Sequence, residues 1–183
     1  MVTYAFGNHV PKIHPSAWIH PRADVTGNVT IRQDVYIGSG AILRGDIGEI
    51  HINAGAAILE NAILQVSPGN SIRIGKNVTV SVGVALHNCE IADGAMIGIK
   101  AIVSDYAYIG EESIIAEGAA VRSRTRVESR TVFAGVPAKE IGKVTDEQAQ
   151  FLRAISQVYR DLAHSYPFKL KEIPLQECIR EIP

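Results

Sequence analysis

The chain has 183 residues, which suits one domain with a small appendage, and its two cysteines, Cys89 and Cys178, are too few for a disulfide framework. Its 18 Lys and Arg residues nearly balance its 19 Asp and Glu residues, so the formal net charge is −1 and the basic footprint of a nucleic-acid-binding protein is missing. No apolar run is long enough to span a bilayer and Met1–Val10 lacks the pattern of a secretory signal, so we expect a cytoplasmic protein with no membrane span.

Aliphatic residues recur along most of the chain with a period of six. The chain contains 24 Ile and 17 Val but only 8 Leu, and β-branched side chains favour strands over helices. The repeated positions are Ile13, Ile19, Val25, Ile31, Ile37, Leu43, Ile52, Ile58, Leu64, Ile74, Val80, Leu86, Ile91, Ile97, Val103, Ile109, Ile115, Val121, Val127 and Phe133. A period of six fits neither a helix nor a hairpin, and it predicts short strands wound into a parallel β-helix of about seven coils.

Extra residues interrupt the repeat twice, one step of five residues leads from Leu86 to Ile91, and small residues often follow the repeat positions. Its phase slips between residues 43 and 52 and again between 64 and 74, and we expect the extra residues to bulge out as loops. Glycine follows a repeat position at Gly38, Gly75 and Gly98, where a small residue would let the chain turn tightly. Because function tends to sit on loops held by a rigid scaffold, the two interruptions are candidate functional regions.

The end of the chain has helical periodicity instead. Thr145 and Gln148 form a capping-box pattern, and Leu152 and Tyr159 are among the apolar residues that follow at helical spacing. We expect a helix over about residues 146–164 that ends before Pro167. The predicted organisation is a β-helix domain at 1–144, a C-terminal helix segment at 145–166 and an extended tail at 167–183.

Six short strings lie on or beside the repeat. They are Leu43-Arg-Gly-Asp46, Ile52 through Val66, Val78-Thr-Val80, Leu86-His-Asn-Cys89, Ile97-Gly98 and Gly135-Val-Pro-Ala-Lys139. Together with the repeat, they resemble the hexapeptide-repeat superfamily and, within it, the γ-class carbonic anhydrase-like branch. The resemblance covers about residues 10–165. It implies an all-β left-handed parallel β-helix with a C-terminal α-helix, assembled as a homotrimer.

The resemblance also implies a metal site at each subunit interface, with three histidines drawn from two subunits. Carried over position by position, these ligands fall on Gln65, Val82 and His87, of which only His87 is a histidine. A catalytic zinc normally has three protein ligands and one open position. We therefore expect zinc to be absent or weakly bound at this degenerate site.

Other positions of the pattern give the remaining candidate site residues. Arg44 and Asp46 match the family's Arg-Gly-Asp string, which lies at the subunit interface and borders the site in the relatives. Glu60 stands where the family has the Asp of a Gln-Asp pair. The candidate catalytic residues are therefore His87, Gln65, Glu60, Arg44 and Asp46, with His87 as the one retained metal ligand.

These observations leave three functions open. The first is a trimeric scaffold or small-anion binder that has lost standard carbonic anhydrase activity. The second is an acyl- or acetyltransferase or thioesterase that binds a coenzyme A thioester and uses His87 as general base. The third is an active metal-dependent carbonic anhydrase in which His51, Glu49, Glu60 or a histidine of the C-terminal tail supplies a substitute ligand in the trimer.

Overall fold

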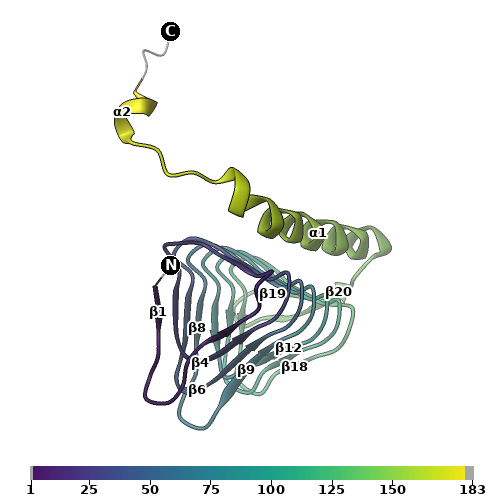
Figure 1. Ribbon diagram of the computed structural model, residues 1–183. Helices are drawn as coiled ribbons and strands as arrows, with labels where there is room; N and C mark the ends of the chain where they lie inside the picture. The colour runs from purple at the N-terminus through teal and green to yellow at the C-terminus, as the bar shows by residue number, and fades with distance from the viewer. Residues whose placement is uncertain (1, 180–183) are drawn as a thin grey trace.

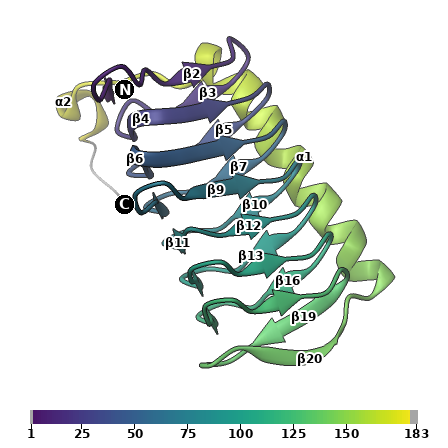
Figure 2. The same ribbon diagram turned by 90° about the horizontal axis from the view of Figure 1, so that it is seen from below.

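Short strands wind into a prism, and a long helix runs along it (Figure 1). The computed structural model describes residues 2–179. Successive coils stack by parallel pairing, as where Trp18 and Ile19 pair with Tyr36 and Ile37 one coil later. Figure 2 shows these stacked rungs with the helix beside them. The architecture is the predicted all-β left-handed parallel β-helix with a C-terminal helix.

The strands form two sheets. The first has 12 strands: β1 (Val2–Tyr4), β2 (Lys12–Ile13), β4 (Asp24–Ile31), β6 (Ile42–Ile52), β8 (Ile63–Gln65), β9 (Ser71–Ile74), β11 (Ala85–His87), β12 (Glu90–Ile91), β14 (Ile102–Val103), β15 (Tyr108–Ile109), β17 (Ala120–Val121) and β18 (Arg126–Val127). The second has 8 strands: β3 (Trp18–Ile19), β5 (Tyr36–Ile37), β7 (Ala57–Ile58), β10 (Thr79–Val80), β13 (Met96–Ile97), β16 (Ile114–Ile115), β19 (Thr131–Ala134) and β20 (Lys139–Lys143). All of the second sheet except the antiparallel β20 stacks as one rung per coil, which gives the predicted seven coils.

The six-residue repeat makes the core. Eighteen of the twenty repeat positions are buried in one continuous aliphatic cluster. The other two, Ile13 and Phe133, are partly buried and belong to the two end regions of the prism. Because nearly every rung points one aliphatic side chain inward, stacking the coils buries the apolar surface without any second layer.

The first interruption of the repeat is a strand, so the loop predicted at 43–52 is wrong. These residues lie within β6, which pairs with β8 through its first half and with β9 through its second half. The neighbouring β4 follows it through a register shift between Gly27 and Val29. Gly27 has a φ of +81°, and a Cβ on it would lie 2.5 Å from the carbonyl oxygen of Gly45. The two glycines therefore let both strands bend while their backbones stay in close contact.

The second interruption is a loop, as predicted. It occupies residues 66–70, between β8 and β9. The backbone N–H of Ser67 in this loop donates to Asn88 Oδ1 at 2.9 Å. A side chain of the following coil therefore anchors the start of the loop.

The small residues that follow repeat positions begin the turns, as predicted, and they also let the coils stack closely. The Gly98 carbonyl oxygen accepts from the Ala101 N–H at 3.1 Å, which closes a turn. A Cβ on Gly98 would lie 2.6 Å from the backbone nitrogen of Glu117 and 2.7 Å from backbone atoms of Ile115 and Ala116 in the next coil. Left-handed backbone occurs at other positions, for example Asn61 with a φ of 58°. The small residue therefore starts the turn and leaves room for the next coil, while a left-handed residue later in the turn bends the chain.

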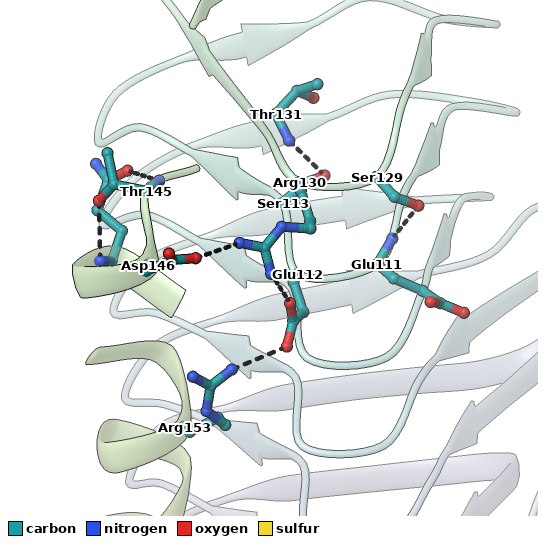
Figure 3. A network of polar contacts seen from close by, with 10 residues as sticks. Glu111, Glu112, Ser113, Ser129, Arg130, Thr131, Thr145, Asp146 and Arg153 are labelled. Carbon is teal, nitrogen blue, oxygen red and sulfur yellow. Dashed lines mark hydrogen bonds and ion pairs between the residues drawn. The ribbon is translucent and has the colours of Figure 1, made fainter. Parts of the chain in front are cut away.

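Helix α1 (Asp146–Lys169) begins where the capping box predicts. Thr145 Oγ1 accepts from the Gln148 N–H at 3.1 Å, and Gln148 Oε1 accepts from the Thr145 N–H at 2.9 Å. Polar contacts then hold the first turns to the prism (Figure 3): Arg130 donates to Glu112 at 2.7 Å and to Asp146 at 3.2 Å.

The predicted end of this helix is wrong, because α1 continues through Pro167 to Lys169. Proline costs one backbone hydrogen bond, but Tyr166 packs on Trp18 with ring centroids 4.5 Å apart and keeps this turn against the prism. A short helix α2 (Leu175–Cys178) interrupts the expected extended tail, whose residues 180–183 lie outside the described part of the chain. No helix within the described range is long and apolar enough to cross a bilayer. The predicted division into segments at residues 144 and 166 stays a prediction.

Replacing Thr145 by alanine is expected to lower the free energy of unfolding by about 1 kcal/mol, or the melting temperature by roughly 2–4 °C. The loss arises because the Gln148 N–H would lose its side-chain acceptor. Thermal unfolding followed by circular dichroism measures the effect. Thr145→Ser keeps the hydroxyl and should behave as wild type; an equal loss in both variants would contradict the capping role.

Candidate functional site

Three of the predicted site residues lie on neighbouring coils of one prism face. Arg44 of β6 is opposite Gln65 of β8, and Gln65 is opposite His87 of β11. Leu64, which precedes Gln65, is buried in the core, so the alternation of a strand directs Gln65 outward. The parallel register thus brings Arg44, Gln65 and His87 into one outward-facing column.

Asp46 lies at the edge of this column, beside Arg44. The Arg44 Nε–H donates to Asp46 Oδ2 at 2.9 Å, and the Arg44 side chain is half exposed. Asp46 is mostly buried, and its Oδ1 is a buried atom without a hydrogen-bond partner among the described residues. The two residues therefore pair within one chain, and their pairing across subunits stays a prediction.

Glu60 and Val82 lie on the helix side of the prism instead. Glu60 Oε1 accepts from the Tyr36 hydroxyl at 3.1 Å. Burial first, and the Glu60 carboxylate second, raise the pKa of Tyr36. Val82 packs against the cluster formed where α1 covers Trp18 and Tyr36. Within one chain, the structure does not bring Glu60 or Val82 to His87.

The residues at the positions where the resemblance places metal ligands do not fit a zinc ion. Val82 has no lone pair to offer, Gln65 offers a neutral amide, and His87 alone is one ligand where a catalytic zinc normally has three. The suggested substitutes His51 and Glu49 pair with each other at 2.9 Å on the second half of β6. Residues 2–179 contain no cluster of three His, Cys, Asp or Glu side chains arranged to hold a metal. Within one chain, these residues therefore offer no zinc site.

His87 itself is part of a hydrogen-bonded group that spans three coils. Its Nδ1 lies 2.8 Å from Asp105 Oδ1, and its Nε2 lies 3.3 Å from Ser67 Oγ. The amide of Asn88 donates to Asp105 Oδ1 at 2.7 Å. This hydrogen bond first, and the contact with His87 second, hold the pKa of Asp105 below its ordinary value. Asp105 is therefore a carboxylate at neutral pH.

A shallow apolar pocket of about 240 Å³ opens beside this group. Its lining includes Ile63 and Ile102, with Gln65, His87 and Asp105 among its polar members. The side chains of His87 and Asp105 are each 37% exposed, so a ligand can reach both. The arrangement can position an apolar group against the imidazole of His87.

Comparison with known proteins identifies the family. A scan against protein-family models finds no match. The chain is 35% identical over 184 residues to the carnitine operon protein CaiE of Escherichia coli K12, with 100% of this chain and 94% of that protein covered. The chain belongs to the CaiE family.

Solved structures add the hexapeptide transferases to the relatives of this CaiE-family chain. A hexapeptide transferase family protein from Anaplasma phagocytophilum is 30% identical with a TM-score of 0.84, covering 90% of this chain and 96% of that protein. A Bacillus cereus protein assigned as an acetyltransferase is 30% identical with a TM-score of 0.88, covering 89% and 95%. The hexapeptide-repeat part of the resemblance is thereby confirmed, while its carbonic anhydrase-like part stays a prediction.

Sequence reasoning missed three members of the His87 group in this CaiE-family chain. Asp105 lies 18 residues after His87, but the coil here is 17 residues long, since Leu86 pairs with Val103. The repeat therefore puts Asp105 one residue past the position in register with His87. Asn88 directly follows His87 and carried no signal beyond its polarity. Ser67 lies in the second interruption, where the period is lost, and only the structure shows that it reaches the imidazole.

Proposed function

We propose that this CaiE-family protein turns over coenzyme A thioesters, passing the acyl group to an acceptor or to water, with His87 as general base. The observation that carries the proposal is the 2.8 Å contact between His87 Nδ1 and Asp105 Oδ1 at the rim of an apolar pocket. The 30% identity to the Bacillus cereus protein assigned as an acetyltransferase supports the same class of chemistry.

The Asp105 carboxylate gives His87 the form that a general base needs. A carboxylate on Nδ1 favours the neutral tautomer with the proton on Nδ1, which leaves the lone pair on Nε2. Nε2 can then take the proton of the group that attacks the thioester carbonyl. A positioned base of this kind typically contributes roughly 10²–10⁴-fold to the rate.

Neighbouring members of the column suit the rest of the substrate. Gln65 lines the pocket with His87, and its amide can donate to the thioester carbonyl oxygen. Arg44, one coil further and half exposed, offers a cation to the phosphate groups of coenzyme A. Ile63 and Ile102 offer the acyl chain an apolar surface.

We infer that the chain forms a homotrimer and that this face of the prism is the interface between its copies. Ile42, Ile63 and Ile102 are exposed by 39%, 44% and 49%, and they stack in register through Ala85. Contiguous exposed apolar surface of this kind usually marks an interface. A neighbouring copy on this face would enclose the pocket between two prisms, where the resemblance to hexapeptide transferases implies that coenzyme A binds.

A second candidate is the trimeric scaffold or small-anion binder without turnover. It is favoured by the absence of histidine at two of the three positions where the resemblance places metal ligands, together with the Arg44–Asp46 pair. The two candidates differ in what they predict for thioesters, because a scaffold has no reason to cleave one.

The test is the release of free coenzyme A thiol from acetyl-CoA and from longer acyl-CoA esters by the purified full chain. We expect thiol release, a melting temperature that rises with coenzyme A because the ligand stabilises the folded state, and a mass in solution of three chains. A trimer that releases no thiol and shows no thermal shift would contradict turnover and favour the scaffold.

A further inference from the structure

The loop at residues 66–70 places a serine hydroxyl against the second nitrogen of His87. Ser67 Oγ lies 3.3 Å from His87 Nε2, while Asp105 occupies Nδ1. A hydroxyl on one imidazole nitrogen and a carboxylate on the other is the arrangement that activates a serine as a nucleophile. General-base catalysis alone would need the histidine and its carboxylate but no serine.

One buried side chain holds this serine and the carboxylate in place. Asn88 Oδ1 accepts from the backbone N–H of Ser67 at 2.9 Å, and Asn88 Nδ2 donates to Asp105 Oδ1 at 2.7 Å. Asn88 is 4% exposed and has a left-handed φ of 44°. Its position is therefore fixed by the coil, and it sets the two outer members of the group relative to the imidazole between them.

A second serine–histidine contact in the chain differs in the direction of the serine hydroxyl proton. Ser16 Oγ lies 2.9 Å from His14 Nδ1, but the Ser16 hydroxyl donates its proton to Asp34 Oδ1 at 2.8 Å. The proton of Ser16 therefore points at a carboxylate and not at the ring. Ser16 therefore serves as a control, because it is a serine close to a histidine whose proton is not directed at the imidazole.

We propose that Ser67 is the nucleophile of a covalent acyl-serine mechanism, with His87 as its base and Asp105 as the group that orients His87. The substrate class rests on the proposed function. Ser67 Oγ attacks the thioester carbonyl carbon as its proton passes to His87 Nε2. The C–S bond then breaks, and the coenzyme A sulfur leaves with that proton as the thiol. Water next attacks the Ser67 ester, giving its proton to His87; the proton returns to Ser67 Oγ as the carboxylic acid is released.

The experiment is labelling with a fluorophosphonate, which forms a Ser Oγ–P bond and releases fluoride without any need for a thioester. Intact mass of the full chain and peptide mapping locate the adduct. We expect one adduct per chain on Ser67, none in Ser67→Ala, and labelling at least 100-fold slower in His87→Gln. Ser16→Ala should label and turn over substrate as wild type does. No adduct, or an adduct on Ser16 in place of Ser67, would overturn the proposal.

Thiol release measured on the same variants separates this proposal from the proposed function. Thiol release that needs His87 but survives in Ser67→Ala would overturn the serine nucleophile and leave thioester turnover standing. Labelling of Ser67 that needs His87, without release of thiol from any acyl-CoA, would support the nucleophile and overturn the substrate class. An acyl group trapped on Ser67 after acyl-CoA is added would support both.

Discussion

Replacing His87 by glutamine is expected to lower the kcat for thioester turnover by roughly 10²–10⁴-fold, the usual contribution of a positioned general base. Glutamine keeps a polar side chain at a position that is 37% exposed, but it has no basic nitrogen to accept a proton. The core beneath it, Leu86, is unchanged, so the melting temperature should move by no more than a few degrees. Initial rates of thiol release at saturating acyl-CoA measure the effect.

Replacing Asp105 by asparagine tests whether the carboxylate sets the tautomer of His87 while the histidine itself is kept. The amide can donate to Nδ1 and so favour the tautomer whose lone pair faces away from Ser67. We therefore expect a large loss of kcat with His87 still in place. Asp161→Asn is the matched control, because Asp161 lies on α1, away from His87, and its side chain accepts from Gln157 alone among the described residues. Full activity in Asp105→Asn would show that the carboxylate does not set the tautomer.

A structural role for His87 would give a different pattern. His87 contacts Ser67, Asn88 and Asp105, so its loss could loosen the loop at 66–70. In that case the KM and the thermal stability of His87→Gln would change together with kcat. A fall in kcat alone, with KM and the melting temperature near wild type, is the signature of a lost base.

The fold was predictable because one physical signal repeats along the chain. Each strand must bury an aliphatic side chain, so a buried aliphatic residue recurs about every six positions and identifies nearly every strand from Ile19 to Val127. The start of the helix was also predictable, because the capping box is a local sequence pattern formed by Thr145 and Gln148. The helix end was not, because the packing of Tyr166 on Trp18, far apart in sequence, outweighs the local effect of Pro167.

The candidate site was only half predictable, and the missing half depends on contacts between coils. His87, Gln65 and Arg44 were found because strings of neighbouring residues carry them. Asp105 could be placed only to within one residue, because Leu86 pairs with Val103 and the coil here is 17 residues long, which leaves Asp105 one residue past the position in register with His87. Ser67 could not, because a loop without a period has no register, and its position depends on the hydrogen bond from its backbone to Asn88.

The interruption at residues 43–52 shows where a periodic argument fails. The lost period predicts a loop, yet β6 stays paired along both of its halves. The pattern shows which side chains face the core. It does not show whether the backbone of a bent strand keeps its hydrogen bonds to the neighbouring strands. Gly27 and Gly45 make that bend possible, but the sequence does not show that these two glycines lie against each other in neighbouring strands.

Replacing Gly98 by valine is expected to destabilise the protein by about 3 kcal/mol, or roughly 6–12 °C in melting temperature, the upper range for overpacking. A Cβ at this position would lie 2.6–2.7 Å from backbone atoms of Ile115, Ala116 and Glu117 in the next coil. Backbone held in a parallel ladder cannot move aside as a flexible side chain can. Two coils would have to separate, at the cost of their pairing. Thermal and urea unfolding measure the loss.

Gly142→Val is the matched control. Gly142 lies within the strand β20, whereas Gly98 directly follows the strand β13, and a Cβ on Gly142 would meet no atom of the described residues within 4 Å. Valine favours strands more than glycine does, so this substitution should leave stability unchanged or slightly raised. The same chemical change is thus expected to have opposite signs at the two sites, since only Gly98 stands between stacked coils. Equal stability changes in both variants would mean that strand propensity, and not the close approach of the coils, determines why glycine follows the repeat at Gly98.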